Sequence, residues 1–254
     1  MLKKRIIPVQ LLNHGRLVKS VNFDNFRDVG DPVSSTKIYN SQYADELIFL
    51  NIDRERDSIE TLLETLEKIS SFAFMPISCG GGIMSENDAT ELILAGADKV
   101  ILNSILYEDL NIIERISSRH GSQAVVVCLD VRFNKDKKIY QLYSNNGEKI
   151  QKISLEEHCE RLAKCNIGEI MIQSIDRDGM MLGYDHYLIN HCIKYIDVPV
   201  IAAGGSSCYD TLLKLFQETN VSGACCGSIF NFSDSNLIRA KSYLKNNNLP
   251  MKVI

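Results

Sequence analysis

Short apolar segments alternate with longer segments of helical periodicity along the whole chain, and this alternation limits the possible folds more than any other feature. Eight of the short segments are predicted to be strands, at residues 5–12, 46–52, 75–80, 99–103, 124–130, 169–174, 198–203 and 223–228. Eight helices are expected near residues 32–43, 58–72, 85–95, 108–119, 154–166, 185–195, 207–219 and 233–246. Three of these helices begin at typical N-cap residues, Asp31, Ser85 and Ser154.

The predicted strands are continuous apolar runs, which is typical of parallel strands covered by helices. Eight strand–helix units within 254 residues match the size of a (β/α)8 barrel, also called a TIM barrel. We therefore predict an α/β fold in which residues 1–254 form one barrel domain. A doubly wound open sheet is the alternative.

An internal repeat indicates that the barrel is built from two similar half-barrels. Ile52-Asp53-Arg54 recurs as Ile175-Asp176-Arg177 at a shift of 123, and Gly80-Gly81 and Ser104 recur as Gly204-Gly205 and Ser228 at a shift of 124. Two matching halves close naturally into a symmetric barrel. Matches this short also arise by chance, which is the alternative interpretation.

One stretch departs from the repeat, near residues 132–153. It holds two β-type pieces, 139–143 and 149–153, joined by the turn sequence Ser144–Gly147. We predict a hairpin inserted after the fifth strand. Long loops at that end of a barrel often cover a functional site.

Charge and composition exclude several classes of partner. The chain has 28 Lys and Arg against 32 Asp and Glu, so a net charge of −4 gives no overall reason to bind nucleic acid or an anionic membrane. The longest apolar runs are far shorter than the roughly 20 residues that span a bilayer, and we expect a cytoplasmic protein. The eight cysteines form no Cys-x-x-Cys motif and the five histidines show no ligand spacing, so neither a metal nor a cofactor is expected. Only His14 is placed near a site.

Small-residue turns follow several of the predicted strands. Glycine lets backbone N–H groups approach an anion, and a helix N-terminus adds partial positive charge. The two sets of turns predict two phosphate sites, one in each half, and thus a ligand with a phosphate at each end; the alternative is that these glycines serve only the turns. The candidate residues are Gly82, Asn103 and Ser104 in the first half and Gly179, Gly204, Gly205, Gly227 and Ser228 in the second.

Asp130 ends the fifth predicted strand, where side chains point into the mouth of a barrel, and is the candidate general acid or base. We place Lys19, Asp53, Asp176 and Asp178 in neighbouring loops. The end of the first strand carries Gln10-Leu11-Leu12 and no acid. A structural role for a buried Asp130 is the alternative.

Four charged residues open predicted strands and are expected at the barrel floor: Arg5, Glu46, Lys99 and Glu169. Two charges of each sign can form a neutral ring. A solvated ring that merely ends the core is the alternative.

Taken together, the motifs resemble those of the cyclase subunit of imidazole glycerol phosphate synthase, in order and along almost the whole chain. The matching segments are Arg5-Ile6-Ile7-Pro8, Gly15-Arg16-Leu17-Val18-Lys19, Val21-Asn22-Phe23, Gly30-Asp31-Pro32, Ala44-Asp45-Glu46-Leu47, Gly80-Gly81-Gly82-Ile83, Gly96-Ala97-Asp98-Lys99-Val100, Gly121-Ser122-Gln123 and Ser174-Ile175-Asp176-Arg177-Asp178-Gly179.

The resemblance implies a (β/α)8 subunit paired with a glutaminase in a heterodimer. Ammonia from the partner would enter through the charged ring, which acts as a gate, and travel up the barrel to a bisphosphorylated ribulosyl substrate. The candidate phosphate residues would hold that substrate. Lys19 and Asp130 would be the catalytic groups, and Asp98 would contact the glutaminase.

The chain departs from the family where the first catalytic acid belongs. Leu11 stands at that position, and leucine cannot transfer a proton. Asn51, where the family commonly has an aspartate, and Gln173 change the same rim.

This pattern resembles a diverged branch of the family that supplies ammonia to a separate amidotransferase, which makes acetamidino groups on surface sugars. We therefore favour a glutaminase-coupled barrel that conducts ammonia and has lost or altered imidazole formation. The alternatives are a true histidine-pathway cyclase that works with Asp130 alone and a phosphosugar isomerase that needs no partner.

Overall fold

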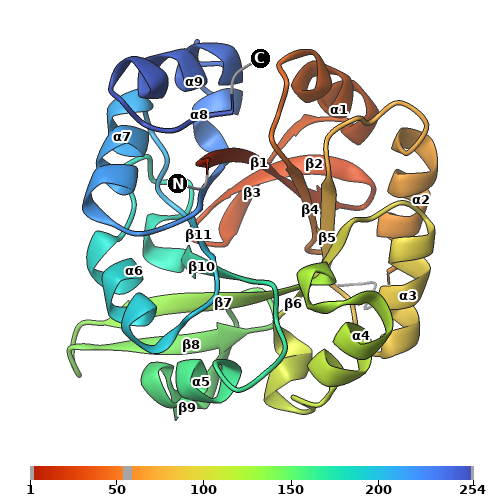
Figure 1. Ribbon diagram of the computed structural model, residues 1–254, viewed down its shortest axis with the longest axis vertical. Coiled ribbons are helices and arrows are strands. Elements are labelled where there is room, and N and C mark those ends of the chain that lie inside the picture. The colour runs from red at the N-terminus through yellow and green to blue at the C-terminus, as the bar shows by residue number, and fades with distance from the viewer. Residues whose placement is uncertain (1–2, 54–58, 253–254) are drawn as a thin grey trace.

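The computed structural model describes residues 3–53 and 59–252 of the chain (Figure 1). Within these ranges eight parallel strands form a closed barrel, because β7 pairs with β10 and β12 pairs with β1. The predicted (β/α)8 fold is confirmed, and the open-sheet alternative is wrong. In barrel order the strands are β1 (Arg5–Asn13), β4 (Leu47–Asn51), β5 (Ile77–Gly80), β6 (Lys99–Leu102), β7 (Val125–Asn134), β10 (Glu169–Ser174), β11 (Val200–Ala203) and β12 (Gly223–Cys226).

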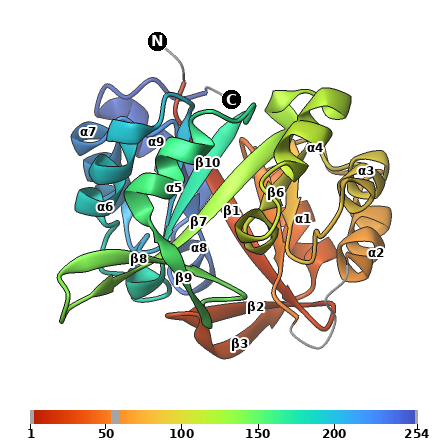
Figure 2. The same ribbon diagram turned by 90° about the horizontal axis from the view of Figure 1, so that it is seen from below.

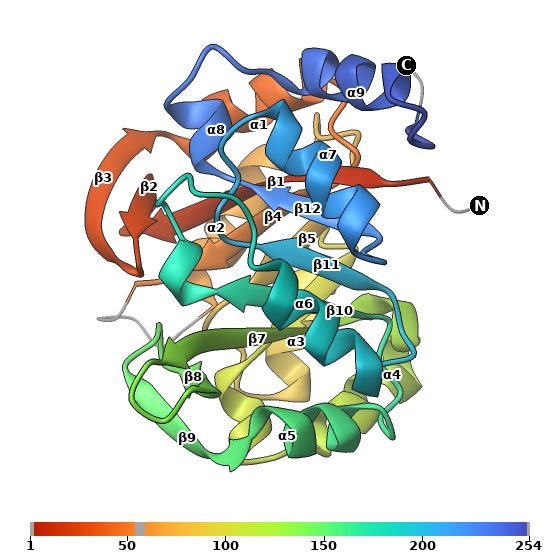
Figure 3. The same cartoon turned by 90° about the vertical axis from the view of Figure 1, so that its left-hand side faces the viewer.

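Helices cover the outside of the barrel (Figure 3). They are α1 (Pro32–Ser41), α2 (Glu60–Ile69), α3 (Glu86–Leu94), α4 (Ile112–His120), α5 (Leu155–Leu162), α6 (His186–Cys192), α7 (Tyr209–Glu218) and α9 (Leu237–Asn246). Asp31, Ser85 and Ser154 cap α1, α3 and α5 as predicted, each accepting a backbone N–H three residues on. No helix in the described ranges combines the length and apolar character needed to cross a membrane.

Shorter helical elements follow several strands. The four-residue helix α8 (Ser228–Asn231) follows β12, and the 3-10 turn η1 (Ser104–Tyr107) follows β6. Further 3-10 turns are η2 (Ser122–Ala124), η3 (Ile175–Arg177) and η4 (Ile193–Tyr195).

Alternation along the strands separates two apolar regions. Ile6 and Leu12 of β1 face the helices in the larger core, whereas Ile7 faces the barrel interior. The interior cluster, which we call the lumen, is formed by Ile7, Ile48, Ile101, Val126, Cys128, Met171, Ile201, Ala203 and Cys225. The lumen therefore joins the two ends of the barrel through apolar and sulfur-containing side chains.

Two hairpins extend from the end of the barrel opposite the N-terminus, which we call the rim (Figure 2). The pair β8 (Ile139–Ser144) and β9 (Lys149–Ser154) continues from β7. The pair β2 (Arg16–Val21) and β3 (Asp24–Gly30) follows β1 and was not predicted. Lys19 therefore lies in a strand, β2, and its placement in a loop was wrong.

Candidate active site at the rim and ion-pair ring at the floor

A pocket of about 520 Å³ opens at the rim and reaches down to the lumen. The carboxyl ends of the strands and both hairpins line it. The structure brings nearly all of the predicted rim residues together in its lining: Leu11, Lys19, Asn51, Asp53, Gly82, Asn103, Ser104, Asp130, Gln173, Asp178, Gly179, Gly204, Gly205, Gly227 and Ser228.

Asp130 lies buried in β7 at the boundary between lumen and pocket. Asn103 Nδ2 donates to Asp130 Oδ2 over 2.7 Å, and the Cys128 thiol donates to Oδ1 over 3.4 Å. Burial raises the pKa of Asp130 to about 7, and the nearby Asp178 adds to the increase. A carboxyl group that titrates near neutral pH can both accept and release a proton.

Lys19 is the second titratable group of the pocket. Its Nζ donates to the carbonyl oxygen of Val9, and burial lowers its pKa to about 8. A Cβ atom on Gly227 would lie 2.8 Å from Lys19 Nζ, so the glycine leaves room for the ammonium group. Asp178, whose pKa is raised by burial, accepts from Ser20 Oγ over 2.7 Å and from Gln173 Nε2 over 3.3 Å.

Leu11 makes the rim asymmetric. In the strand register Leu11 of β1 pairs with Leu50 of β4, whereas Asp130 of β7 pairs with Gln173 of β10. All four side chains line the pocket. The described rim therefore carries an acid on β7 and none on β1, where Lys19 of the adjacent β2 is the titratable group.

The glycine turns of the two halves have the same geometry. Gly81 and Gly204 have φ values of 92° and 88°. A Cβ atom would lie 1.9 Å from the carbonyl oxygen of Asn51 in the first case and 2.5 Å from that of Ser174 in the second. Only glycine fits either turn, and both glycines line the pocket.

Short helices provide a second equivalence between the halves. Asn103, which precedes η1, has φ −140° and ψ −84°, and Gly227, which precedes α8, has φ −125° and ψ −80°. Ser104 and Ser228 therefore open matching turns on opposite sides of the pocket. Two such N-termini suit the binding of two anionic groups. The repeat seen in the sequence thus has a structural counterpart; its Arg54 lies outside the described residues.

Two predicted neighbours of the site have other positions. His14 and Asp176 are not part of the pocket lining. His14 Nδ1 lies 3.2 Å from Asp53 Oδ2, and Asp176 accepts the backbone N–H of Phe133 over 2.7 Å. His14 therefore lies beside the site, in contact with the lining residue Asp53, and not in the lining itself.

The β8–β9 turn closes one side of the pocket. The backbone N–H of Asn145 donates to Ser104 Oγ over 3.0 Å, and Asn146 Nδ2 donates to the carbonyl oxygen of Ile52 over 3.2 Å. Sequence analysis missed these contacts, as well as the role of Asn103 in holding Asp130. The position of Asn103 after the strand next to β7 was the available signal.

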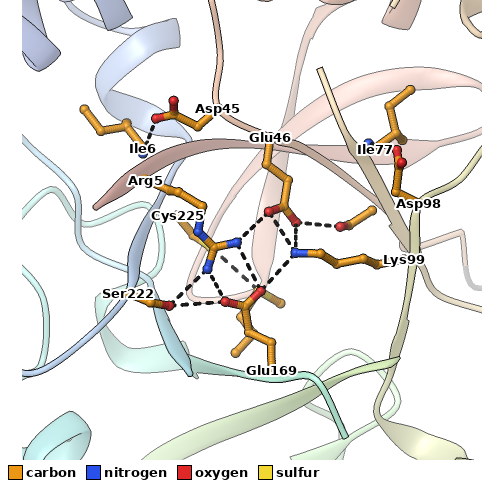
Figure 4. Close-up of polar contacts among 12 residues, drawn as sticks. Arg5, Ile6, Asp45, Glu46, Ile77, Asp98, Lys99, Glu169, Ser222 and Cys225 are labelled. Atoms are coloured by element: carbon orange, nitrogen blue, oxygen red, sulfur yellow. Dashed lines mark hydrogen bonds and ion pairs between the residues drawn. The ribbon is translucent and has the colours of Figure 1, made fainter. Parts of the chain in front are cut away.

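The four floor residues form one ion-pair ring (Figure 4). Arg5 Nη1 donates to Glu46 Oε2 over 2.8 Å, and Arg5 Nη2 donates to Glu169 Oε1. Lys99 Nζ lies 3.0 Å from Glu46 Oε2 and 3.1 Å from Glu169 Oε2. Each cation therefore bridges both carboxylates.

Burial differs within the ring. The side chains of Glu46 and Glu169 are 3% and 6% exposed, against 24% for Arg5 and 20% for Lys99. Burial would raise the pKa of Glu169, but Arg5 and Lys99 outweigh it and hold that pKa below its usual value. Burial would likewise lower the pKa of Arg5, but Glu169 and Glu46 raise it. The ring is thus a charged, mutually neutralised layer beneath the lumen.

Two aspartates beside the ring have different surroundings. Asp45 Oδ2 accepts the backbone N–H of Ile6 over 3.0 Å, and its Oδ1 accepts from Lys241 Nζ over 2.7 Å. Asp98 Oδ2 accepts the backbone N–H of Ile77 over 2.8 Å in the same manner, but Asp98 is exposed. Its carboxylate is held rigidly at the floor surface.

In the part of the chain that the structure describes, no group of three or more His, Cys, Asp or Glu side chains is arranged to hold a metal ion. Of the eight cysteines, six are buried, Cys165 is half-buried and Cys208 is exposed.

Comparison with known proteins shows the family of the chain. Residues 5–236 match the family described as histidine biosynthesis protein. Three relatives carry the name imidazole glycerol phosphate synthase subunit HisF. The Staphylococcus carnosus protein is 35% identical over 252 residues, 99% of each chain. Those of Chlorobium limicola and Bacillus cereus strain Q1 are 36% and 38% identical over 253 residues, 100% of each chain. The chain belongs to the histidine biosynthesis protein family, among the relatives of the imidazole glycerol phosphate synthase subunit HisF.

Proposed function

We propose that the chain is the cyclase-type subunit of a glutamine-dependent complex, in which a glutaminase docks at the floor and ammonia passes through the barrel to the rim pocket. We further propose that Leu11 has weakened or altered imidazole formation and that the ammonia serves amidination of a surface sugar. The observation that carries the proposal is the complete ion-pair ring of Arg5, Glu46, Lys99 and Glu169 beneath an apolar lumen.

The ring and lumen suit ammonia. Burying two carboxylates at the end of a barrel costs free energy, and charged side chains left in solvent would cost less. A ring of charges can instead exchange hydrogen bonds with a small polar molecule. Ammonium ion is disfavoured in the apolar lumen above, whereas neutral ammonia is not.

The floor also offers a surface for the glutaminase. Tyr43, Phe74 and Leu94 lie in or beside the loops that enter the strands at this end, and they are 57%, 85% and 80% exposed. Exposed apolar side chains beside a charged group are typical of protein interfaces. Asp98, whose carboxylate accepts the backbone N–H of Ile77, would bind a cationic group of the partner.

The rim pocket supports a ligand with two phosphates. Its two glycine turns and two short helix N-termini lie on opposite sides, as a bisphosphorylated ribulosyl compound would require. Ring closure with ammonia needs proton transfer on both sides of the substrate. The apolar pair Leu11 and Leu50 leaves β1 without an acid, and loss of one acid or base typically costs about 10² to 10⁴ in rate.

Histidine biosynthesis remains the second candidate, in which the chain forms imidazole glycerol phosphate and aminoimidazole carboxamide ribotide. The observation that favours it is the retention of Asp130 and Lys19 in one pocket, with pKa values of about 7 and 8. The names of the relatives point the same way.

Purification of the tagged chain from its own cells tests the proposal. We expect mass spectrometry to identify a glutaminase and a sugar-modifying amidotransferase among the captured proteins. Capture of a glutaminase together with histidine-pathway turnover would favour the second candidate, and failure to capture any glutaminase would overturn both.

Lys99 allows a sharper test in the purified complex. Lys99→Met should lower the stimulation of glutamine hydrolysis roughly tenfold, because it breaks the coupling through the ring. Lys149→Met is the matched control, since Lys149 forms only an exposed ion pair at the rim. Equal stimulation in both variants would contradict a role for the ring.

A further inference from the structure

We propose that Cys128 is a positioning residue, whose thiol holds the Asp130 carboxyl group in one orientation at the boundary between lumen and pocket. The inference rests on the proposed function in one respect, because it takes Asp130 as the remaining proton-transfer group of the rim. It assigns to Cys128 a part that the motifs of the chain do not indicate.

The geometry comes from β7. Cys128 precedes Asp130 by two residues, so both side chains face the barrel interior. Cys128 belongs to the lumen cluster and also lines the pocket. Its Sγ lies 3.4 Å from Asp130 Oδ1, while Asn103 Nδ2 lies 2.7 Å from Oδ2. Each carboxyl oxygen thus has its own donor, one from the lumen below and one from the residue that follows the neighbouring strand β6.

The thiol acts as a donor and not as a nucleophile. Burial, followed by the nearby Asp130, raises the pKa of Cys128 well above its usual value. The sulfur therefore keeps its proton at neutral pH. A protonated thiol 3.4 Å from a carboxylate oxygen donates its hydrogen to that oxygen.

A weak donor has a particular advantage here. A hydroxyl or a backbone N–H would stabilise the carboxylate strongly and would return the pKa of Asp130 toward the acid range. The Cys128 thiol also lowers the pKa of Asp130, but as a weaker donor than a hydroxyl it does not outweigh the effect of burial. Cys128 is therefore suited to fix the orientation of Asp130 while leaving it able to titrate near pH 7.

Other groups also face Asp130, and they stay constant in the test below. Asp178, beyond β10, raises the pKa of Asp130. Asp130 in turn raises the pKa of Tyr107 in η1. Gln173 is the register partner of Asp130. Lys19 faces Asp178, and Glu108 and Glu148 line the same pocket.

Carbon-13 NMR of the full chain, labelled at aspartate carboxyl carbons, measures the titration of Asp130 directly. The Asp130→Asn variant identifies the signal. Cys128→Ser supplies a stronger donor and should lower the pKa by about 0.5 to 1 unit, whereas Cys128→Ala removes the donor and should raise it by about 0.5 unit. Cys79→Ala is the matched control, since Cys79 is equally buried but faces the helices.

Shifts of opposite sign in the two Cys128 variants, with no shift in the control, support the proposal. Shifts of the same sign, or none, overturn it. Cys128→Val, which fills the lumen without a donor, replaces Cys128→Ala if that variant fails to fold. The titration uses neither glutaminase nor substrate, so its failure leaves the ammonia route untouched, and failure of glutaminase coupling leaves this result untouched.

Discussion

Asp130 and Lys19 show how burial adapts ordinary side chains to chemistry near neutral pH. Burial raises the pKa of one to about 7 and lowers that of the other to about 8, so both can exchange protons in the same pH range. Leu11, across the same pocket, offers no such exchange. The difference between the two sides of the rim is a matter of single residues, since the backbone at both is a parallel strand of the same barrel.

The raised pKa of Asp130 predicts a pH-dependent effect on stability. The folded chain binds this proton more tightly than the unfolded chain, where an aspartate titrates near about 3.9. The stabilising contribution is therefore complete below about pH 4 and is lost as the pH rises through about 7. At pH 8, Asp130→Asn should raise the free energy of unfolding by roughly 1 to 3 kcal/mol, with no gain at pH 4.

Urea unfolding of Asp130→Asn at pH 4 and pH 8 measures this effect, with the exposed Asp136→Asn as control. An equal change at both pH values would show that burial does not destabilise the Asp130 carboxylate. Since the substitution removes the proposed proton-transfer group, any gain in stability should accompany a loss of activity.

Among the elements, α9 is joined to the barrel by a buried ion pair. The side chains of Lys241 and Asp45 are 5% and 2% exposed, and Asp45 also accepts the Ile6 backbone N–H of β1. Lys241→Ala would leave Asp45 charged and buried without its cation, which should cost about 3 to 5 kcal/mol of unfolding free energy.

Urea unfolding at pH 7 tests this prediction against Arg161→Ala. Arg161 and Glu157 form an exposed pair within α5, whose loss should cost no more than about 0.5 kcal/mol. Similar losses in the two variants would mean that the Lys241 pair contributes no more than a surface contact.

Element prediction from the sequence succeeded where hydrophobic periodicity was strong. All eight barrel strands and the eight larger outer helices were identified, because each buries a continuous apolar run or an amphipathic face. The β2–β3 hairpin was missed because β3, Asp24–Gly30, is mostly exposed and has no apolar pattern. The four-residue helix α8 is too short to show a period.

The site was predictable to a similar degree. Asp130 and Ser228 were predicted from the rule that active sites lie at the carboxyl end of barrel strands. The prediction that Asp130 ends its strand was wrong, because β7 continues to Asn134 and pairs with β8. The contact of Asn103 with Asp130 and the pairing of Lys241 with Asp45 depend on the packing of different elements. No local pattern in the sequence encodes them.

At the scale of the whole molecule, the proposed function places two activities at opposite ends of the barrel. A partner would act at the floor, and chemistry would occur at the rim. The exposed Phe74 and Leu94 are then interface residues. Phe74→Glu should weaken glutaminase binding by about 10- to 100-fold without changing the free energy of unfolding.

Titration calorimetry with the purified glutaminase measures that loss. Tyr187→Glu is the control, because Tyr187 is 73% exposed but lies on α6, on the outer wall of the barrel. Equal affinities for Phe74→Glu and the unmodified chain would place the glutaminase elsewhere.

The account depends most on the claim that Leu11 limits imidazole formation at a rim that holds Asp130 and Lys19. The most direct measurement is turnover of the ribulosyl aminoimidazole carboxamide substrate with an ammonium salt, comparing the unmodified chain with Leu11→Asp and with Leu11→Asn, which has a similar size but no acid. We predict that Leu11→Asp forms the imidazole product at least about 10²-fold faster than the other two. An unmodified chain that is as fast as Leu11→Asp would contradict the account.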